Sequence, residues 1–320
     1  MLEGSPHVMD ITNAHRTALM DIERCKWSEE QLWEYRIDQR SLPQIKSSAE
    51  YFGKLRVSRL KGVPVTGVLG DQHAALLGHG CTEKGDLKTT YGTGCFVLSN
   101  TGEDLVRSDD RLLSTIAFQL GPHTRPQYAL EGPIANAGSA VEWLVRKAEL
   151  LKLSQDLDVD AADTSDGVVF VPSLSGSLAP RWNPDARGAF LGLQLSTTRS
   201  NMIKSVIDAI AFSVKEVIGI IKDDVSVEIK RLVVDGGLSN SNLVMQTQAN
   251  VLGIPVERAE MVEATAFGAA KAAAIGLGLT DWPLELKTRK TTVFMPQAGP
   301  ILDADYDRWK MAVERVNKWL

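Results

Sequence analysis

The amino-acid sequence predicts an α/β fold, in which strands and helices alternate along the chain. In its second half, the apolar runs at residues 167–172 and 231–235 each precede a segment with helical periodicity. Alternation of this kind is typical of a sheet covered by helices. The 320 residues, 44% hydrophobic and 23% charged, suffice to bury a sizeable core in about two domains.

The charge balance argues against two classes of partner. The 35 Lys and Arg residues face 40 Asp and Glu residues, a net charge of -5, so no net basic field favours nucleic acid or an anionic membrane. We find no run of about 18 apolar residues that would cross a membrane, and no signal peptide. Cys25, Cys81 and Cys95 have neither disulfide-framework density nor metal-ligand spacing. We therefore expect a cytoplasmic protein.

The first half predicts a short helix and a set of strands. Ser28, followed by two acidic residues, predicts the capped start of a helix. Val65–Leu69 predicts a strand that ends at Gly70–Asp71, with a helix at Gln72–Leu77. Four apolar runs punctuated by Gly and Thr then predict a meander: Leu87–Tyr91, Phe96–Ser99, Leu113–Phe118 and Gln127–Glu131.

The second half predicts longer helices between strands. Helices are expected at about residues 137–151 and 198–221, and after the glycine pair at 236–237. Strands are expected at Gly167–Pro172 and Arg231–Asp235, with a loop at 175–188. The small residues of Ala264–Ala274 predict a helix suited to close packing.

Gly70–Asp71–Gln72 is the first candidate site. A strand ending at Gly70 would present the Asp71 carboxylate at a strand carboxyl end, where open α/β sheets bind ligands. A carboxylate there can accept a proton from a substrate hydroxyl or bind Mg²⁺. The same residue can also serve as a helix N-cap, and the two roles are compatible.

Three glycine motifs are candidate anion sites. Gly92–Thr93–Gly94, between two strand-like runs, can turn backbone N–H groups toward a phosphate, or can be only a hairpin turn. Asp235–Gly236–Gly237 precedes a helix whose N-terminal N–H groups suit phosphate, with Ser239 as a candidate cap, or is only a tight connection. Gly138–Ser139, at the start of a helix, leaves room for a nucleotide or serves helix–sheet packing.

In their order along the chain, these motifs resemble those of the FGGY carbohydrate kinases, and among them the kinases that phosphorylate glycerol. The resemblance extends over essentially the whole sequence. It is carried by His7–Ala14, Gly70–Gln72, Thr90–Phe96, Leu130–Gly132, Ala137–Ser139, Ala179–Gly188, Val234–Gly237 and Glu263–Ala270.

The resemblance implies an actin-like ATPase (ribonuclease H-like) fold that transfers phosphate from ATP, with Mg²⁺, to glycerol, giving glycerol 3-phosphate. It makes Asp71 the catalytic base and a Mg²⁺ ligand, and it makes Asp71, Gln72 and Phe96 the glycerol-binding residues. Phosphoryl transfer needs positioning and charge neutralisation rather than a covalent nucleophile, which agrees with this residue set. The residues implied on the nucleotide side are Gly92, Thr93, Gly94, Gly138, Glu142, Gly236, Gly237 and Ser241. Glu142 and Ser241 stand where the family usually has Gln and Asn.

The resemblance also implies a division of the chain into lobes. Residues 1–79 would be a remnant of the N-terminal lobe, and residues 80–320 the complete C-terminal nucleotide-binding lobe. Family members begin with a phosphate loop and an Arg-Glu pair for glycerol, and neither is found in this sequence. Two alternatives therefore stay open: a non-catalytic fragment or isoform that retains nucleotide or partner binding, and a kinase for another polyol or sugar. Association into a homo-oligomer is also left open.

Overall fold

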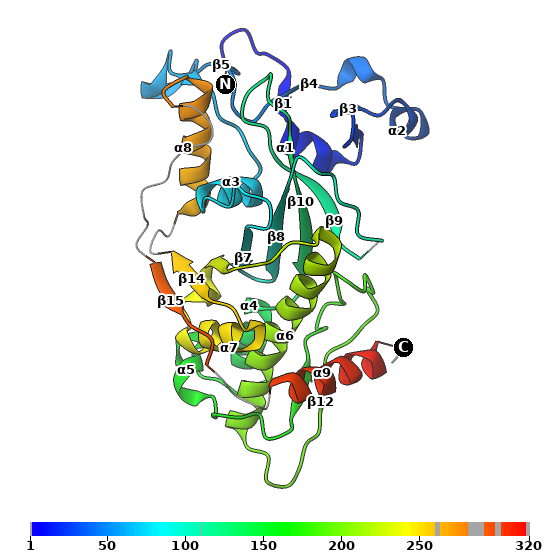
Figure 1. Ribbon diagram of the computed structural model, residues 1–320, viewed down its shortest axis with the longest axis vertical. Helices are drawn as coiled ribbons and strands as arrows, with labels where there is room; N and C mark the ends of the chain where they lie inside the picture. The colour runs from blue at the N-terminus through cyan, green and yellow to red at the C-terminus, as the bar shows by residue number, and fades with distance from the viewer. Residues whose placement is uncertain (1, 110, 260–262, 281–290, 298–301, 318–320) are drawn as a thin grey trace.

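The computed structural model describes residues 2–109, 111–259, 263–280, 291–297 and 302–317, and its centre is a seven-stranded mixed sheet (Figure 1). The strand order is β15-β14-β13-β7-β8-β10-β9. The neighbours β7–β13 and β13–β14 are parallel, and the other pairs are antiparallel. The strands are β7 (Leu87–Tyr91), β8 (Cys95–Gly102), β9 (Leu113–Phe118), β10 (Gln127–Ile134), β13 (Leu232–Asp235), β14 (Val256–Ala259) and β15 (Thr291–Phe294).

The predicted strands of the central region are present, but the predicted meander is wrong. A meander would place β9 between β8 and β10. Instead β10 pairs with β8 on one side and with β9 on the other. Because β10 is flanked on both sides, it is buried along nearly its whole length, whereas β9 forms an edge of the sheet.

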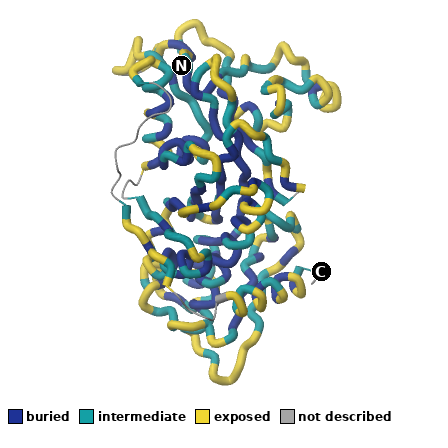
Figure 2. Tube along the Cα trace, in the orientation of Figure 1, coloured by how far each residue is buried: buried dark blue, intermediate teal, exposed yellow. Residues whose placement is uncertain are grey.

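Helices cover both faces of the sheet, so strand residues alternate between two cores. In β8, Val97 packs into the core formed with α4, α6, α7 and α9, and the next residue, Leu98, packs into the core formed with α3 and α8. Figure 2 shows the buried residues gathered in the sheet and in the helix surfaces against it. The helices are α1 (Ile11–Ala14), α2 (Glu29–Glu34), α3 (Asp71–Gly78), α4 (Gly138–Arg146), α5 (Leu157–Asp160), α6 (Arg199–Val225), α7 (Asn242–Leu252), α8 (Ala264–Gly276) and α9 (Leu302–Val316).

Local signals explain where the two longer predicted helices begin and end. A capping box between Thr198 and Asn201 starts α6, and Ser226 ends it in the left-handed conformation. Helix α4 ends at Arg146, earlier than predicted, because the chain turns through Glu149 at a φ of 54°.

No helix in the described part of the chain combines the length and apolar character needed to cross a bilayer.

The remaining strands form two-stranded ribbons outside the main sheet. Ile11 of α1 and Met20 of β2 pack against Ile116 of β9 and Tyr128 of β10. The N-terminal residues therefore lie against this edge of the main sheet. The ribbons are β1 (Val8–Asp10) with β4 (Gln44–Lys46), β2 (Met20–Asp21) with β3 (Lys26–Trp27), β5 (Gly53–Lys54) with β6 (Pro64–Val65), and β11 (Val169–Val171) with β12 (Ala189–Leu191).

The strand predicted at Val65–Leu69 is wrong in extent, because β6 contains only Pro64–Val65. The next residue, Thr66, donates its hydroxyl hydrogen to the backbone oxygen of Ala273 in α8 (2.8 Å). A Cβ atom at Gly67 would lie 2.4 Å from the Ala273 nitrogen. Thr66 and Gly67 are therefore held against α8, and the strand ends at Val65.

Candidate functional site

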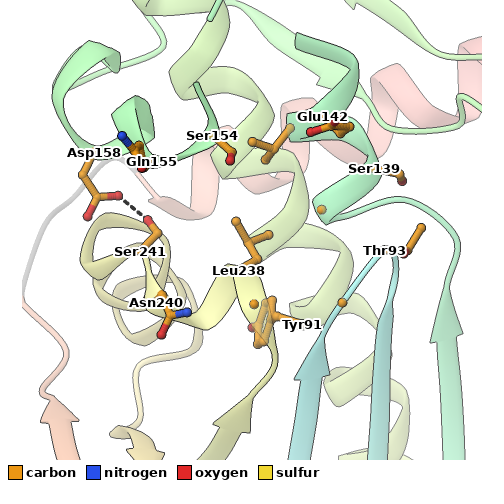
Figure 3. Close-up of a pocket in the computed structure, with 14 residues that line it drawn as sticks. Tyr91, Thr93, Ser139, Glu142, Ser154, Gln155, Asp158, Leu238, Asn240 and Ser241 are labelled. Carbon is orange, nitrogen blue, oxygen red and sulfur yellow. Dashed lines mark hydrogen bonds between the residues drawn. The ribbon is translucent and has the colours of Figure 1, made fainter. Parts of the chain in front are cut away.

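A cavity of about 690 Å³ opens beside the turn that joins β7 to β8 (Figure 3). This size is within the usual range of small-molecule sites. Four segments meet there: the β7–β8 turn, the start of α4, residues 154–158, and the connection from β13 to α7. The lining residues are Tyr91, Gly92, Thr93, Gly138, Ser139, Val141, Glu142, Ser154, Gln155, Asp158, Gly237, Leu238, Asn240 and Ser241.

The β7–β8 turn and the start of α4 hold each other by backbone hydrogen bonds. The N–H groups of Gly138 and Ser139 donate to the carbonyl oxygens of Gly92 (3.0 Å) and Thr93 (2.9 Å). A Cβ atom at Gly138 would lie 2.5 Å from the Gly92 oxygen, so only glycine permits this approach. The N–H group of Thr93, which is exposed and lines the cavity, has no acceptor among the described residues, so the turn keeps a donor for a ligand.

Two predicted nucleotide-side glycines shape the cavity without lining it. Gly94 is buried, and a Cβ atom there would lie 2.1 Å from the Ile134 oxygen. Gly236 has a φ of 90°, and its Cβ would lie 2.5 Å from the Tyr91 oxygen. Both positions need glycine because two backbone segments cross there. Gly92, Thr93, Gly138, Glu142, Gly237 and Ser241, the other predicted residues, all line the cavity.

The start of α7 is not free for a phosphate, which favours the second interpretation of Asp235–Gly236–Gly237, a tight connection. The Asp158 carboxylate accepts hydrogen bonds from the Ser241 hydroxyl and from the N–H groups of Asn242 (2.9 Å) and Leu243 (3.3 Å) (Figure 3). The N-cap of α7 is Ser241 rather than Ser239, whose hydroxyl instead donates to the Gly236 oxygen (2.6 Å). A carboxylate of the chain itself thus takes the place that an anion would occupy.

Sequence reasoning missed several residues of the cavity wall. Asp158, Ser154 and Gln155 belong to a segment with no glycine motif and no strand end, so no local pattern marks them. They reach the cavity because the 3-10 turn Ser154–Asp156 contacts α4 and because α5, which contains Asp158, packs against α7. The other wall residues outside our prediction are Tyr91, Val141, Leu238 and Asn240, while Ser139 was expected only as a small neighbour of Gly138.

The predicted glycerol residues lie outside this cavity, on the α3 side of the sheet. Phe96 packs with the α3–α8 core, and Asp71 and Gln72 are the first two residues of α3. Two expectations about Asp71 are wrong. It does not end a strand, and it is not the N-cap, because Gly70 occupies that position. Asp71 is exposed, and its Oδ1 accepts a hydrogen bond from the Gln72 N–H (2.8 Å).

The N-terminal segment fixes the backbone just before Asp71. The Thr12 hydroxyl donates to the buried Asp10 carboxylate (2.7 Å) and accepts from the Gly70 N–H (2.9 Å). Asp10 also accepts from the N–H groups of Thr12 and Asn13 and from the Ser48 hydroxyl. Burial raises the pKa of Asp10 despite these donors. The start of α3 and the start of α1 are therefore connected by hydrogen bonds that lead to one buried carboxylate, that of Asp10.

A buried polar network connects α3 to the sheet. Lys88 of β7 is fully buried, and its ammonium donates to Gln72 Oε1 (2.5 Å) and Thr90 Oγ1 (2.8 Å). Thr90 lies opposite Asp235 in the parallel register of β7 and β13. Asp235 Oδ2 lies 2.7 Å from His79 Nε2. Burial raises the pKa of Asp235, but His79, Lys88 and Thr90 together hold it below its ordinary value. The network runs from Gln72 to Asp235, whose neighbour Gly236 contacts Tyr91 in the cavity wall.

Among the described residues, no group of three or more His, Cys, Asp or Glu side chains is placed to hold a metal ion.

His73, which is buried, and His15, which is half-buried, predict a loss of stability in acid. Burial lowers the pKa of His15 to about 4 and that of His73 to about 3, against about 6.5 in an unfolded chain. Below pH 6.5 these two imidazoles bind protons in the unfolded state but stay neutral in the folded state. The free energy of unfolding therefore decreases as the pH falls from 6.5 toward these lower pKa values. Denaturant unfolding at pH 5.5 should show a free energy of unfolding about 2–3 kcal/mol lower than at pH 7.5.

The matched comparison uses His123, which is exposed, and His73. The variant His123→Asn should keep the pH dependence of the parent, whereas His73→Asn should show a shallower one. Equal free energies of unfolding at both pH values would contradict the burial of these two rings in their neutral form.

Comparison with protein families gives two matches. The C-terminal domain of the FGGY family of carbohydrate kinases matches residues 87–277, and the N-terminal domain of the same family matches residues 1–78. The glycerol kinase of Brucella anthropi is 40% identical over 99% of this chain, and glycerol kinase 1 of Streptomyces coelicolor is 42% identical over 99%. The chain spans 64% of the length of each of these relatives.

Solved structures of carbohydrate kinases share the fold of this chain. The crystal structure of Plasmodium falciparum glycerol kinase with ADP has a TM-score of 0.90 and 33% identity, covering 98% of this chain and 64% of that one. A xylulose kinase from Rhodospirillum rubrum, 24% identical, matches in fold with a TM-score of 0.81, covering 99% of this chain and 66% of that one. The predicted actin-like fold is confirmed. By these matches, and by the motifs gathered around the cavity and at the start of α3, the chain belongs to the FGGY family of carbohydrate kinases.

Proposed function

We propose that this protein takes part in the ATP-dependent phosphorylation of glycerol to glycerol 3-phosphate. The observation that carries the proposal is the identity of 40–42% with glycerol kinases over 99% of the chain. The likeness to a glycerol kinase solved with ADP, and a cavity of nucleotide size at the β7–β8 turn, support it. We further propose that residues 1–79 and 80–320 belong to the two lobes of such a kinase.

On the substrate side, the Asp71 carboxylate would accept the proton of the attacking glycerol hydroxyl. The hydroxyl oxygen then bonds to the γ-phosphorus of ATP, the bond to the β–γ bridging oxygen breaks, and ADP leaves. Asp71 is suited to this because it is exposed and only its Oδ1 is engaged by the chain. Gln72 would also hold glycerol, and Phe96 would pack against the carbon face of glycerol.

On the nucleotide side, the free N–H group and the hydroxyl of Thr93 would bind phosphate oxygens. Gly138, Glu142, Gly237 and Ser241 would line the nucleoside, with Gly92, Gly94 and Gly236 giving the backbone its close approach.

The negative charge of the ATP phosphates must be neutralised at this site. The cavity lining contains two carboxylates and no Lys or Arg. Asp158 accepts three hydrogen bonds from the start of α7 but keeps its charge, whereas Glu142 forms an ion pair with Arg146. Mg²⁺ bound by ATP would supply the missing positive charge, and the oxygen ligands it prefers are available at Asp71.

Replacing Thr93 by valine should weaken ADP binding about three- to tenfold, because one hydrogen bond to a phosphate is lost at unchanged side-chain volume. Glycerol affinity should not change. Titration calorimetry with ADP and with glycerol measures both, and Thr124→Val, in an exposed turn outside the cavity, is the matched control. An unchanged ADP affinity would remove Thr93 from the phosphate site.

The proposed function is tested by two measurements on the 320-residue chain. Calorimetry with glycerol and with ADP reports binding, and a coupled assay reports glycerol-dependent release of ADP. Binding of both ligands with turnover supports the kinase, while binding without turnover supports a ligand-binding role in which the chain needs further residues for catalysis. A chain that binds neither ligand would refute the proposal, and one that prefers xylulose or another polyol to glycerol would correct the substrate.

A further inference from the structure

Lys88 is a buried cation placed beneath the candidate glycerol site. Its ammonium lies 2.5 Å from Gln72 Oε1 and 2.8 Å from Thr90 Oγ1, and the side chain has no exposure to solvent. Burial lowers its pKa, while Asp235, Glu131 and Asp71 oppose that effect. A charged ammonium can donate hydrogen bonds but cannot accept them.

This property of Lys88 decides which way the Gln72 amide points. Because the ammonium only donates, the Gln72 oxygen must face Lys88, and the amide NH₂ must point away from it. Gln72 Nε2 has no hydrogen-bond partner among the described residues, and Gln72 is only half-buried. The two N–H donors of the amide are therefore available at the surface where α3 begins.

Asp71 is oriented in a complementary way by the same turn of helix. Its Oδ1 accepts from the Gln72 N–H, and no protein donor in the described chain engages Oδ2. The first turn of α3 thus presents a free acceptor from Asp71 and free donors from Gln72. A hydroxyl group donates one hydrogen bond and can accept another, so it can donate to the Asp71 carboxylate and accept from the Gln72 amide at the same time.

We propose that Lys88 is a positioning and specificity-determining residue, which fixes the Gln72 amide so that Asp71 and Gln72 together recognise a hydroxyl group of the polyol. The proposal rests on the proposed function, since it assigns these two residues to glycerol. Lys88 itself does not touch the substrate. A free amide would populate both orientations, and in one of them its oxygen would face the substrate beside the Asp71 carboxylate, offering two acceptors and no donor.

The test measures glycerol affinity by calorimetry in a set of variants of the 320-residue chain. Lys88→Met removes the ammonium at similar length and should weaken glycerol binding about three- to tenfold, the range for one hydrogen bond, with ADP affinity unchanged. Gln72→Glu offers Lys88 an oxygen but no donor to the substrate, and should weaken glycerol binding by at least as much. Because Gln72 lies at the start of a helix and is half-buried, Gln72→Glu also serves if Lys88→Met does not fold.

A double variant separates positioning from a merely structural role. In a Gln72→Met background no amide remains to be oriented, so adding Lys88→Met should cause no further loss of glycerol affinity. Lys204→Met is the matched control, because Lys204 is also buried beside a carboxylate, Asp208, at a cavity remote from α3. It should bind glycerol as the parent chain does.

Each outcome bears on the proposal. Equal losses from Lys88→Met in the parent and in the Gln72→Met background would overturn it, as would parent-like glycerol affinity in Gln72→Glu. If the parent chain binds glycerol but the variants give either of these two results, the proposed function stands and Lys88 has no role in positioning Gln72. A parent chain that does not bind glycerol refutes the proposed function and removes the role with it.

Discussion

Replacing Asp71 by asparagine is expected to lower glycerol-dependent ADP release by about 10²–10⁴-fold, the usual contribution of a general base. The amide has nearly the shape of the carboxylate but cannot take up the hydroxyl proton at neutral pH. Its oxygen can still accept the Gln72 N–H bond that Asp71 Oδ1 accepts now. The fold and the ADP affinity should therefore stay as in the parent, and the loss should fall on turnover.

The control is Asp104→Asn, which changes an exposed carboxylate just beyond the end of β8 that pairs with Lys84. Its rate should equal that of the parent in the same coupled assay. A near-parental rate for Asp71→Asn would exclude Asp71 as the base, and a loss of ADP affinity would show that Asp71 acts on the nucleotide instead. If the 320-residue chain shows no turnover, the comparison is made in a form extended by the N-terminal part of a glycerol kinase relative.

Gly268→Ala is expected to destabilise the protein by about 3 kcal/mol, at the upper end of the usual cost of overpacking. Helices α3 and α8 cross in backbone contact, and a Cβ atom at Gly268 would lie 1.8 Å from the Ala74 oxygen. A Cβ atom at Gly78 would meet the Ala264 oxygen at 1.9 Å, so the contact is close from both sides. The helices must separate to admit the methyl group, which also displaces Asp71 at the start of α3.

Gly219→Ala provides the matched control in a helix. Gly219 lies in α6 and is exposed, and a Cβ atom there would have no neighbour within 4 Å. Alanine at that position should stabilise the protein by about 0.5–1 kcal/mol, since glycine is the poorer helix former. Denaturant unfolding of both variants gives the two free energies. Equal effects would show that α3 and α8 do not pack as closely as the structure has them.

Local pattern was enough to predict most secondary structure around the site. Strand β7 and strand β9 have the predicted bounds, and Ser28 caps α2 as expected, because alternation and capping depend on neighbours in sequence. The failed predictions share a cause. The extent of β6 depends on α8, about 200 residues away, and the order of β8, β9 and β10 depends on which strand edges pair.

The candidate site divides in the same way. Glycine motifs near Thr93, Gly138 and Gly237 could be recognised from the sequence, because close backbone approach restricts the residue type. Asp158 could not, since a carboxylate that caps a helix 83 residues away has no local signature.

The sequence by itself determined the family, the residues of the glycine turns and the alternation of strands and helices, since all of these are written in neighbouring residues or in motif order. Only the tertiary structure decided that Asp158 covers the start of α7, that the strand before Asp71 ends at Val65, and that Lys88 orients Gln72. Each of these depends on contacts between segments that lie far apart in the sequence. At Lys88, which is fully buried, an unpaired polar group would cost too much free energy to persist.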